Sequence, residues 1–162
     1  MPTFPSAICS HGLTRVAEIP LVGAGGEPVD FARTIVSHGV AELLPNRVDL
    51  PARTLWTTLP VPGGARTVRL TSSDGALHVD VVAGRIGSRT RDVLTATIRH
   101  MFRLVDDLSA FYAVTRADPE LDWCARGAGR MLRAPTVFED VVKTTWTFIR
   151  IFGAPFPNGR SD

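Results

Sequence analysis

The chain has 162 residues, of which 44% are hydrophobic and 21% are charged. These fractions are close to those of soluble globular proteins, so they argue against disordered, collagen-like and low-complexity chains. The 18 basic residues comprise 17 arginines and one lysine, Lys143, and the formal net charge is +2. An arginine-rich composition permits nucleic-acid binding because guanidinium groups bind phosphate in a bidentate manner, but a GC-rich coding sequence gives the same bias.

Targeting and metal-binding signals are weak. No apolar run approaches the ~18 residues of a membrane span. The N-terminus lacks the basic and apolar regions of a signal peptide. Cys9 and Cys124 are too far apart in sequence to suggest a disulfide framework or a zinc site. The four histidines, which lack metal-ligand spacing, are His11, His38, His78 and His100. We therefore expect a cytoplasmic protein with no metal, no cofactor and no membrane association.

The first half of the chain is β-rich. A β-like run over residues 13–22 ends in the glycine-rich segment 23–26, and Asp30 then caps a short predicted helix. Ser73-Asp74-Gly75 is typical of a tight hairpin turn. Strands are predicted over residues 54–59 and 66–71 before this turn, and over residues 77–81 after it. These patterns predict an antiparallel sheet with one helix, in a domain over residues 1–88.

After Ser88 the hydrophobic period changes from 2 to 3.6, which indicates a helical domain over residues 89–162. An amphipathic helix is predicted with Leu94 and Val105 on its apolar face, followed by shorter helices over 108–114 and 119–125, the second capped by Asp118. The last helix, Thr136–Phe152, opens with a capping box between Thr136 and Glu139. This helix is apolar nearly all round, and such a helix needs neighbours on every side.

Three local patterns favour structural interpretations. The run Ile19–Gly26, IPLVGAGG, resembles a dinucleotide-binding loop, but the fingerprint needs glycine where Pro28 stands, so a flexible loop is favoured. The adjacent Asp106 and Asp107 would diverge on a helix, so they are interpreted as a helix cap and not as a catalytic pair. Ser37-His38 lacks a nucleophile elbow and a third partner for a hydrolase triad.

A basic cluster near the last helix is the candidate nucleic-acid site. Between Trp123 and Arg150 the only acidic residues are Glu139 and Asp140. A loop of glycine, alanine and arginine that runs into a helix N-terminus can hold a phosphate. The alternative is a solvated face with ion pairs between residues four apart. The candidate DNA-binding residues are Arg126, Arg130, Arg133 and Lys143.

The segment Ile98–Thr144 carries LSAFY at 108–112, GRMLR at 129–133 and PTVFEDVVKT at 135–144. In these motifs it resembles DNA glycosylases of the helix-hairpin-helix superfamily, specifically the 3-methyladenine DNA glycosylase II branch. The resemblance implies an α+β fold with an N-terminal antiparallel β-α-β-β-β sheet, similar to the TATA-binding protein. The first helices of an all-α glycosylase domain would follow this sheet.

The resemblance also implies a function in base excision repair, in which a hydrolase removes alkylated purines from DNA. In that family the chemistry lies C-terminal to the VVKT segment, in a hairpin of the type L-P-G-[VI]-G and an aspartate beyond it. Neither motif occurs in residues 145–162, and neither Asp140 nor Asp162 follows such a hairpin. We therefore expect an inactive N-terminal portion of a glycosylase, truncated before its catalytic elements, with no catalytic residue.

Two other interpretations remain open at this point. The chain could be a non-catalytic DNA-binding or partner-binding module that uses the sheet and the arginines, or it could be a remnant reading frame of low stability. The expected partners are double-stranded DNA, bound weakly, and a second copy of the chain. Self-association is expected through the helix Thr136–Phe152, because its apolar faces have too few neighbours in the sequence to cover them.

Overall fold

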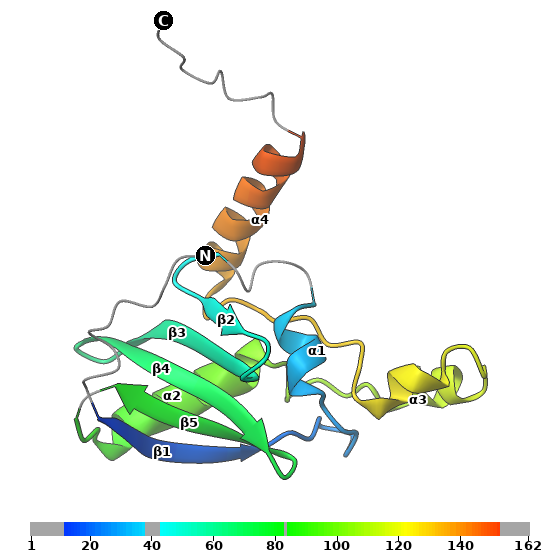
Figure 1. Ribbon diagram of the computed structural model, residues 1–162, viewed down its shortest axis with the longest axis horizontal. Coiled ribbons are helices and arrows are strands. Elements are labelled where there is room, and N and C mark those ends of the chain that lie inside the picture. Colours follow the sequence, from blue (N-terminus) through cyan, green and yellow to red (C-terminus); the bar gives the residue numbers. More distant parts are fainter. Residues whose placement is uncertain (1–11, 38–42, 83, 153–162) are drawn as a thin grey trace, which may run out of the picture.

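The computed structural model describes residues 12–37, 43–82 and 84–152, and for residues 147–152 it describes the backbone alone. Figure 1 shows a twisted sheet with a long helix behind it, shorter helices to one side, and a final helix that projects away from the sheet. Among the described helices, none combines the length and the apolar character needed to cross a bilayer.

The sheet contains five strands in the order β1-β5-β4-β3-β2, and all neighbours are antiparallel. This arrangement confirms the predicted α+β fold with an antiparallel N-terminal sheet. The three-residue strand β2 was not predicted, because three residues are too few to display an alternating pattern. The strands are β1 (Leu13–Pro20), β2 (Arg47–Asp49), β3 (Thr54–Val61), β4 (Gly64–Ser73) and β5 (Ala76–Val82).

The predicted hairpin turn joins β4 to β5. Ser73 pairs with Ala76, so the loop has two residues. Asp74 and Gly75 both have left-handed backbone conformations, with φ of 52° and 73°. A two-residue loop of this kind has the twist that antiparallel strands need. The two-residue turn predicted from Ser73-Asp74-Gly75 therefore sets the register between β4 and β5.

The hydrophobic core lies between one face of the sheet and α2 (Ser88–Met101). From α2 it receives Leu94, Ile98 and Met101, all at most 1% exposed. The short helix α1 (Phe31–Ile35) adds Phe31, whose ring stacks on Phe102 with centroids 5.6 Å apart. The core is continuous across residue 88. The sheet contributes Ile19, Leu55, Leu59, Val68, Leu70, Leu77, Val79 and Val81.

The helix α2 ends earlier than the sequence pattern predicted. It stops at Met101, because Arg103 adopts a left-handed conformation with φ of 55°. The Arg103 N–H donates to the His100 carbonyl and the Leu104 N–H to the Arg99 carbonyl, which together form a Schellman ending. Val105, predicted on the buried face of this helix, is therefore exposed.

Two helices begin at side-chain caps that the sequence predicted. Asp30 Oδ1 accepts a hydrogen bond from Arg33 N (3.0 Å) at the start of α1, as predicted. Thr136 Oγ1 accepts from Glu139 N (3.2 Å) at the start of the last helix, which confirms that half of the capping box. After α2 the chain forms α3 (Ser109–Arg116), η3 (Asp122–Arg126) and then α4 (Val137–Phe152).

The predicted helix over 119–125 is confirmed only in part, because residues 119–121 form a turn and the helix that follows is of the 3-10 type. Asp118 Oδ1 accepts from Glu120 N in a local turn, and only the 3-10 helix η3 follows. Gly127, with φ of 98°, ends η3.

Candidate nucleic-acid interface

Arg130, one of the predicted DNA-binding residues, is buried. Its side chain is 0% exposed and that of its partner Glu27 is 4% exposed. Arg130 Nη2 donates to Glu27 Oε1 and to the Asp106 carbonyl (3.0 Å), and Nη1 donates to the Arg103 carbonyl. Leu108 N also donates to Glu27 Oε1 (2.8 Å). The guanidinium of Arg130 therefore has no surface on which a DNA phosphate could bind.

The glycine-rich loop after β1 packs closely against this ion pair. A Cβ atom on Gly23 would lie 2.0 Å from Arg130 Nη2, and one on Gly25 would lie 2.2 Å from Asp107 Oδ1. The loop is therefore packed rather than flexible, which corrects the expectation from sequence. Its glycines allow the backbone to approach the ion pair, and this accounts for the GAGG sequence without a dinucleotide.

Arg133 lies at the surface beside Asp106. Arg133 Nη2 is 3.7 Å from Asp106 Oδ2, and Arg103 Nε is 2.6 Å from the same oxygen. The hydrogen bond from Arg103 is the main reason that the pKa of Asp106 lies below its usual range, and the nearby Arg133 and Arg130 charges add to it. The structure therefore brings Arg130 and Arg133 together on Asp106, with Arg103 as a third cation that sequence reasoning missed.

Lys143 is buried on α4, at a groove that Leu43, Leu44, Val142 and Trp146 also line. Its side chain is 6% exposed, and Nζ lies 2.5 Å from Glu139 Oε1, one helical turn away. This is the ion pair between residues four apart that the alternative interpretation of the cluster expected. Lys143 is therefore a structural residue of α4 in this structure.

Arg126 is exposed on η3, next to an exposed tryptophan. Trp123 is 45% exposed, and the Arg33 guanidinium lies 4.9 Å from the centre of its ring. Arg33 Nη1 also donates to the Trp123 carbonyl (3.3 Å). Because residues three apart share one side of a 3-10 helix, Arg126 lies on the same side of η3 as Trp123. Sequence reasoning missed Arg33 and Trp123 because 90 positions separate them.

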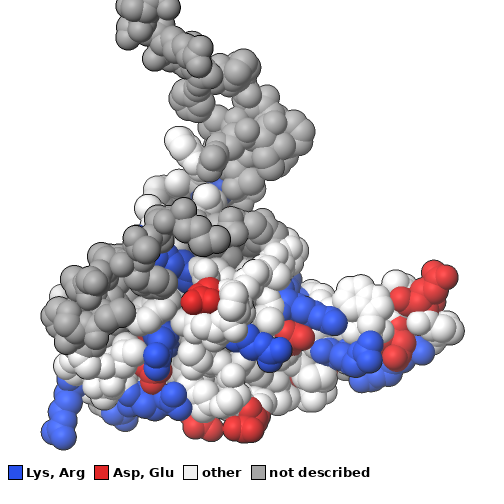
Figure 2. Space-filling model, viewed as in Figure 1, with Lys and Arg blue, Asp and Glu red and all other residues white. Residues whose placement is uncertain are grey.

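Arginine side chains around an exposed aromatic ring can perform two tasks in nucleic-acid binding. The cations neutralise phosphates, and the ring offers a surface on which an unpaired base can stack. Figure 2 shows basic and acidic side chains interspersed over the visible face, rather than one continuous basic surface. The candidate interface is therefore local, and it consists of Arg33, Trp123 and Arg126, with Arg133 as a separate surface cation.

The charges on the other face of the sheet are largely paired with each other. Asp80, at 4% side-chain exposure, receives Arg15 Nε and Arg69 Nη2, each at 2.8 Å. Burial by itself would raise the pKa of Asp80, but the hydrogen bonds and charges of Arg15 and Arg69 outweigh it and hold the pKa below its usual value. This cluster stabilises the sheet and uses two arginines that would otherwise be available to a ligand.

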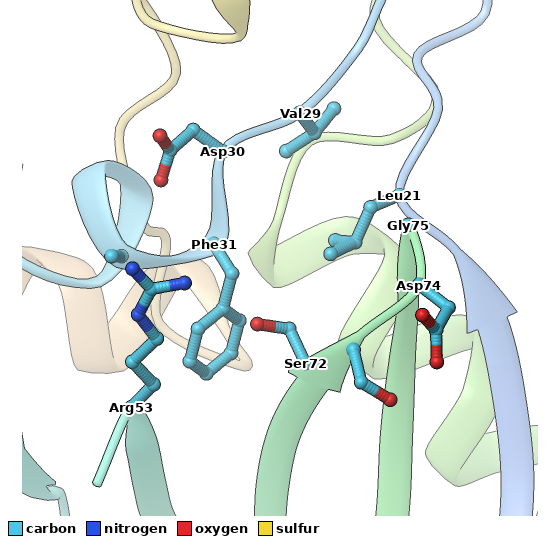
Figure 3. A pocket seen from close by; sticks show the side chains of 10 residues that line it. Leu21, Val29, Asp30, Phe31, Arg53, Ser72, Asp74 and Gly75 are labelled. Carbon is cyan, nitrogen blue, oxygen red and sulfur yellow. The ribbon is translucent and has the colours of Figure 1, made fainter.

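A pocket of about 280 Å³ lies between the start of α1 and the β4–β5 hairpin. Figure 3 shows Leu21, Val29 and Phe31 within it, with Arg53 on one side and Asp74 on the other. Small-molecule sites usually measure about 300–1,000 Å³, so this pocket lies just below that range. Its carboxylates have structural positions, because Asp30 caps α1 and Asp74 forms the hairpin turn. We assign it no chemistry.

Within the described part of the chain, no three His, Cys, Asp or Glu residues are grouped closely enough to hold a metal ion. His11 and His38 are outside that part. The carboxylates of Glu27, Asp80 and Asp106 each form an ion pair with an arginine.

The architecture has a counterpart among solved structures. The chain is similar to a structure of the 3-methyladenine DNA-glycosylase from Archaeoglobus fulgidus, with a TM-score of 0.54 and 17% sequence identity. The similarity covers 76% of this chain and 41% of that one, so the chain spans less than half of the solved protein. No family model and no curated protein matches the sequence.

Proposed function

We propose that the chain is a DNA-binding part of a repair protein of the DNA-glycosylase type, acting on alkylated purines. The observation that carries this proposal is the similarity of fold to a 3-methyladenine DNA-glycosylase over 76% of the chain. The motifs within residues 108–144, which resemble the same kind of protein, support it independently. A cytoplasmic location in contact with the nucleoid is part of the proposal.

The proposed DNA contacts are the two predicted arginines that are accessible. Arg126 and Arg133 would bind phosphates, because both guanidinium groups reach the surface. Arg130 and Lys143 are left out of the proposed contact because they are buried in ion pairs. Trp123, exposed between Arg33 and Arg126, would contribute a stacking surface for an unpaired base. With few cations involved, binding to double-stranded DNA would be weak and strongly dependent on salt.

We expect the 162-residue chain to bind DNA without removing a base. Excision needs an extruded nucleotide held in a pocket, and a group that stabilises the charge that develops on the sugar. Loss of one such electrostatic group typically costs on the order of 10²–10³-fold in rate. No aspartate follows a phosphate-binding hairpin in this sequence.

The test combines two measurements on one sample. Fluorescence anisotropy with a labelled duplex should detect binding that weakens as the salt concentration rises. Incubation with methylated DNA, followed by detection of free 3-methyladenine, should give no release above a protein-free control. Base release that disappears on substitution of a single aspartate or glutamate would refute the expected inactivity. Absence of salt-dependent binding would refute the DNA-binding proposal itself.

The alternative is a module that binds a protein partner. The observation in its favour is the exposure of apolar residues on α4, such as Val137, Phe138 and Val141, which is independent of the arginines. Absence of DNA binding together with concentration-dependent association of the chain in analytical ultracentrifugation would favour this alternative.

A further inference from the structure

Trp123 carries a guanidinium group on one face of its ring. The Arg33 side chain lies over the indole, with its guanidinium carbon 4.9 Å from the ring centre. The same group donates from Nη1 to the Trp123 carbonyl (3.3 Å), so it contacts both the ring and the backbone of this residue. Trp123 is nevertheless 45% exposed. The surface that the ring offers to a ligand therefore lies away from Arg33.

Arg33 is itself held in place by the residue that caps α1. Asp30 Oδ1 accepts a hydrogen bond from the Arg33 backbone N–H (3.0 Å), and Asp30 Oδ2 lies 3.6 Å from Arg33 Nε. One carboxylate therefore contacts both the backbone and the side chain of Arg33. Because the guanidinium is planar and rigid, a group fixed by a carboxylate and a carbonyl also fixes the ring on which it packs.

The two elements that carry this pair, α1 and η3, are also joined through the backbone. Asp30 N donates to the Gly127 carbonyl (3.1 Å), and a Cβ atom on Gly127 would lie 2.6 Å from Asp30 N. The hydroxyl of the buried Tyr112 donates to the neighbouring Ala128 carbonyl (2.6 Å). Trp123 is therefore held in position before a ligand binds, and a group that is already ordered loses less conformational entropy on binding.

We propose that Arg33 is a positioning residue that restricts Trp123 to stacking on a single unpaired base. A ring that inserts between two stacked base pairs needs both of its faces, and Arg33 occupies one of them. A ring with one open face can still stack on a base that has no partner. The site therefore selects DNA with an unpaired base over an intact duplex. This inference rests on the proposed function, because it concerns the same DNA contact.

Binding of a phosphate by Arg33 would give a different result from positioning. A phosphate contact adds to the affinity for every form of DNA and steepens the salt dependence of that affinity. Positioning of the ring acts only on the preference for an unpaired base. Lysine keeps the charge of arginine but lacks its planar, forked guanidinium. Arg33→Lys therefore separates the two roles, because it retains the charge and loses the planar group.

The test compares a labelled duplex with the same duplex carrying one unpaired adenine, by fluorescence anisotropy. Wild type should bind the bulged duplex more tightly by about 5- to 150-fold, the factor that corresponds to one stacked base. In Arg33→Gln and in Arg33→Lys this ratio should fall severalfold, while the affinity for the plain duplex and its salt slope stay those of wild type. Arg66→Gln, which also removes one exposed arginine, should keep the wild-type ratio.

Three outcomes would overturn the inference. Equal affinity of wild type for the two duplexes would refute it and leave the proposed function standing, because binding to duplex DNA remains. Retention of the wild-type ratio by Arg33→Gln or by Arg33→Lys would show that the planar group of Arg33 does not position the ring. Absence of binding to either DNA would refute the proposed function, and this inference with it.

Discussion

Glu27 and Arg130 are 103 positions apart in the chain and form a buried ion pair. Glu27 lies in the loop between β1 and α1, and Arg130 lies in the segment between η3 and α4. Arg130 also donates to two carbonyls in the turn after α2. This single guanidinium therefore connects the sheet region, the end of α2 and the segment that leads to α4.

Removal of Arg130 should be severely destabilising. Arg130→Ala leaves the Glu27 carboxylate buried without its partner, which typically costs about 3–5 kcal/mol. The free energy of unfolding, measured by urea denaturation, gives this value directly. The exposed Arg66→Ala should change it by about 0.5 kcal/mol or less. The pair Glu27→Leu with Arg130→Met should recover part of the loss, because no buried charge remains unpaired. A loss below about 1 kcal/mol for Arg130→Ala would contradict the burial described here.

Glycine at position 23 should be required by space. Gly23→Ala introduces a Cβ atom 2.0 Å from Arg130 Nη2 and 2.2 Å from Glu27 Oε1. Displacement of the ion pair should cost about 1–3 kcal/mol, which thermal denaturation can measure. Gly12→Ala is the matched control, because its Cβ would meet no atom within 4 Å. Equal melting temperatures for the two variants would show that the loop is not packed on the ion pair.

Asp80 should make the stability of the sheet sensitive to acid. Its pKa is lower in the folded chain than the ordinary value of 3.8. The ion pairs with Arg15 and Arg69 therefore stabilise the fold above pH 3.8, and this contribution is lost as the pH falls toward the folded-state pKa. Asp80→Asn should be less stable than wild type by on the order of 1–2 kcal/mol at pH 7. The difference in unfolding free energy between wild type and Asp80→Asn should narrow below pH 3.8, as urea denaturation at several pH values can establish. A difference that stays constant with pH would exclude the Asp80 ion pairs as its cause.

Trp123 should contribute to DNA affinity by stacking rather than by charge. Trp123→Ala should weaken binding to a single-stranded or bulged oligonucleotide by about 1–3 kcal/mol, the range for one stacked base. The salt dependence of the affinity of this variant should equal that of wild type, because no cation is removed. Trp123→Phe keeps an aromatic surface and should retain most of the affinity. Equal weakening by both substitutions would argue that the indole edge, and not its face, makes the contact.

The sequence predicted local features well because local chemistry determines them. The alternation at Val68 and Leu70, the turn at Asp74-Gly75 and the cap at Asp30 all appear in the structure. Two errors have separate causes. The end of α2 is set by Arg103 in a left-handed conformation, which glycine would have signalled. Arg130 resembled a surface cation because its partner Glu27 is distant in sequence.

The expected exposure of the last helix is a separate case. It holds for Phe138 and Trp146, which are exposed. The other large apolar residues of this helix, Phe148, Ile149 and Phe152, have side chains outside the described part of the structure. The hydrophobic pattern alone could not specify that α4 would be oriented with Lys143 buried. That orientation depends on tertiary packing.

The central claim, that Arg126 and Arg133 contact DNA phosphates, is tested most directly by the salt dependence of duplex affinity. The variant Arg126→Gln with Arg133→Gln should bind more weakly than wild type, and its slope of log K against log salt should be shallower by roughly 0.9 for each lost phosphate contact. Arg66→Gln, which removes an exposed arginine of β4, should keep the wild-type slope. A double variant with the wild-type slope, or an equal loss in Arg66→Gln, would contradict the account.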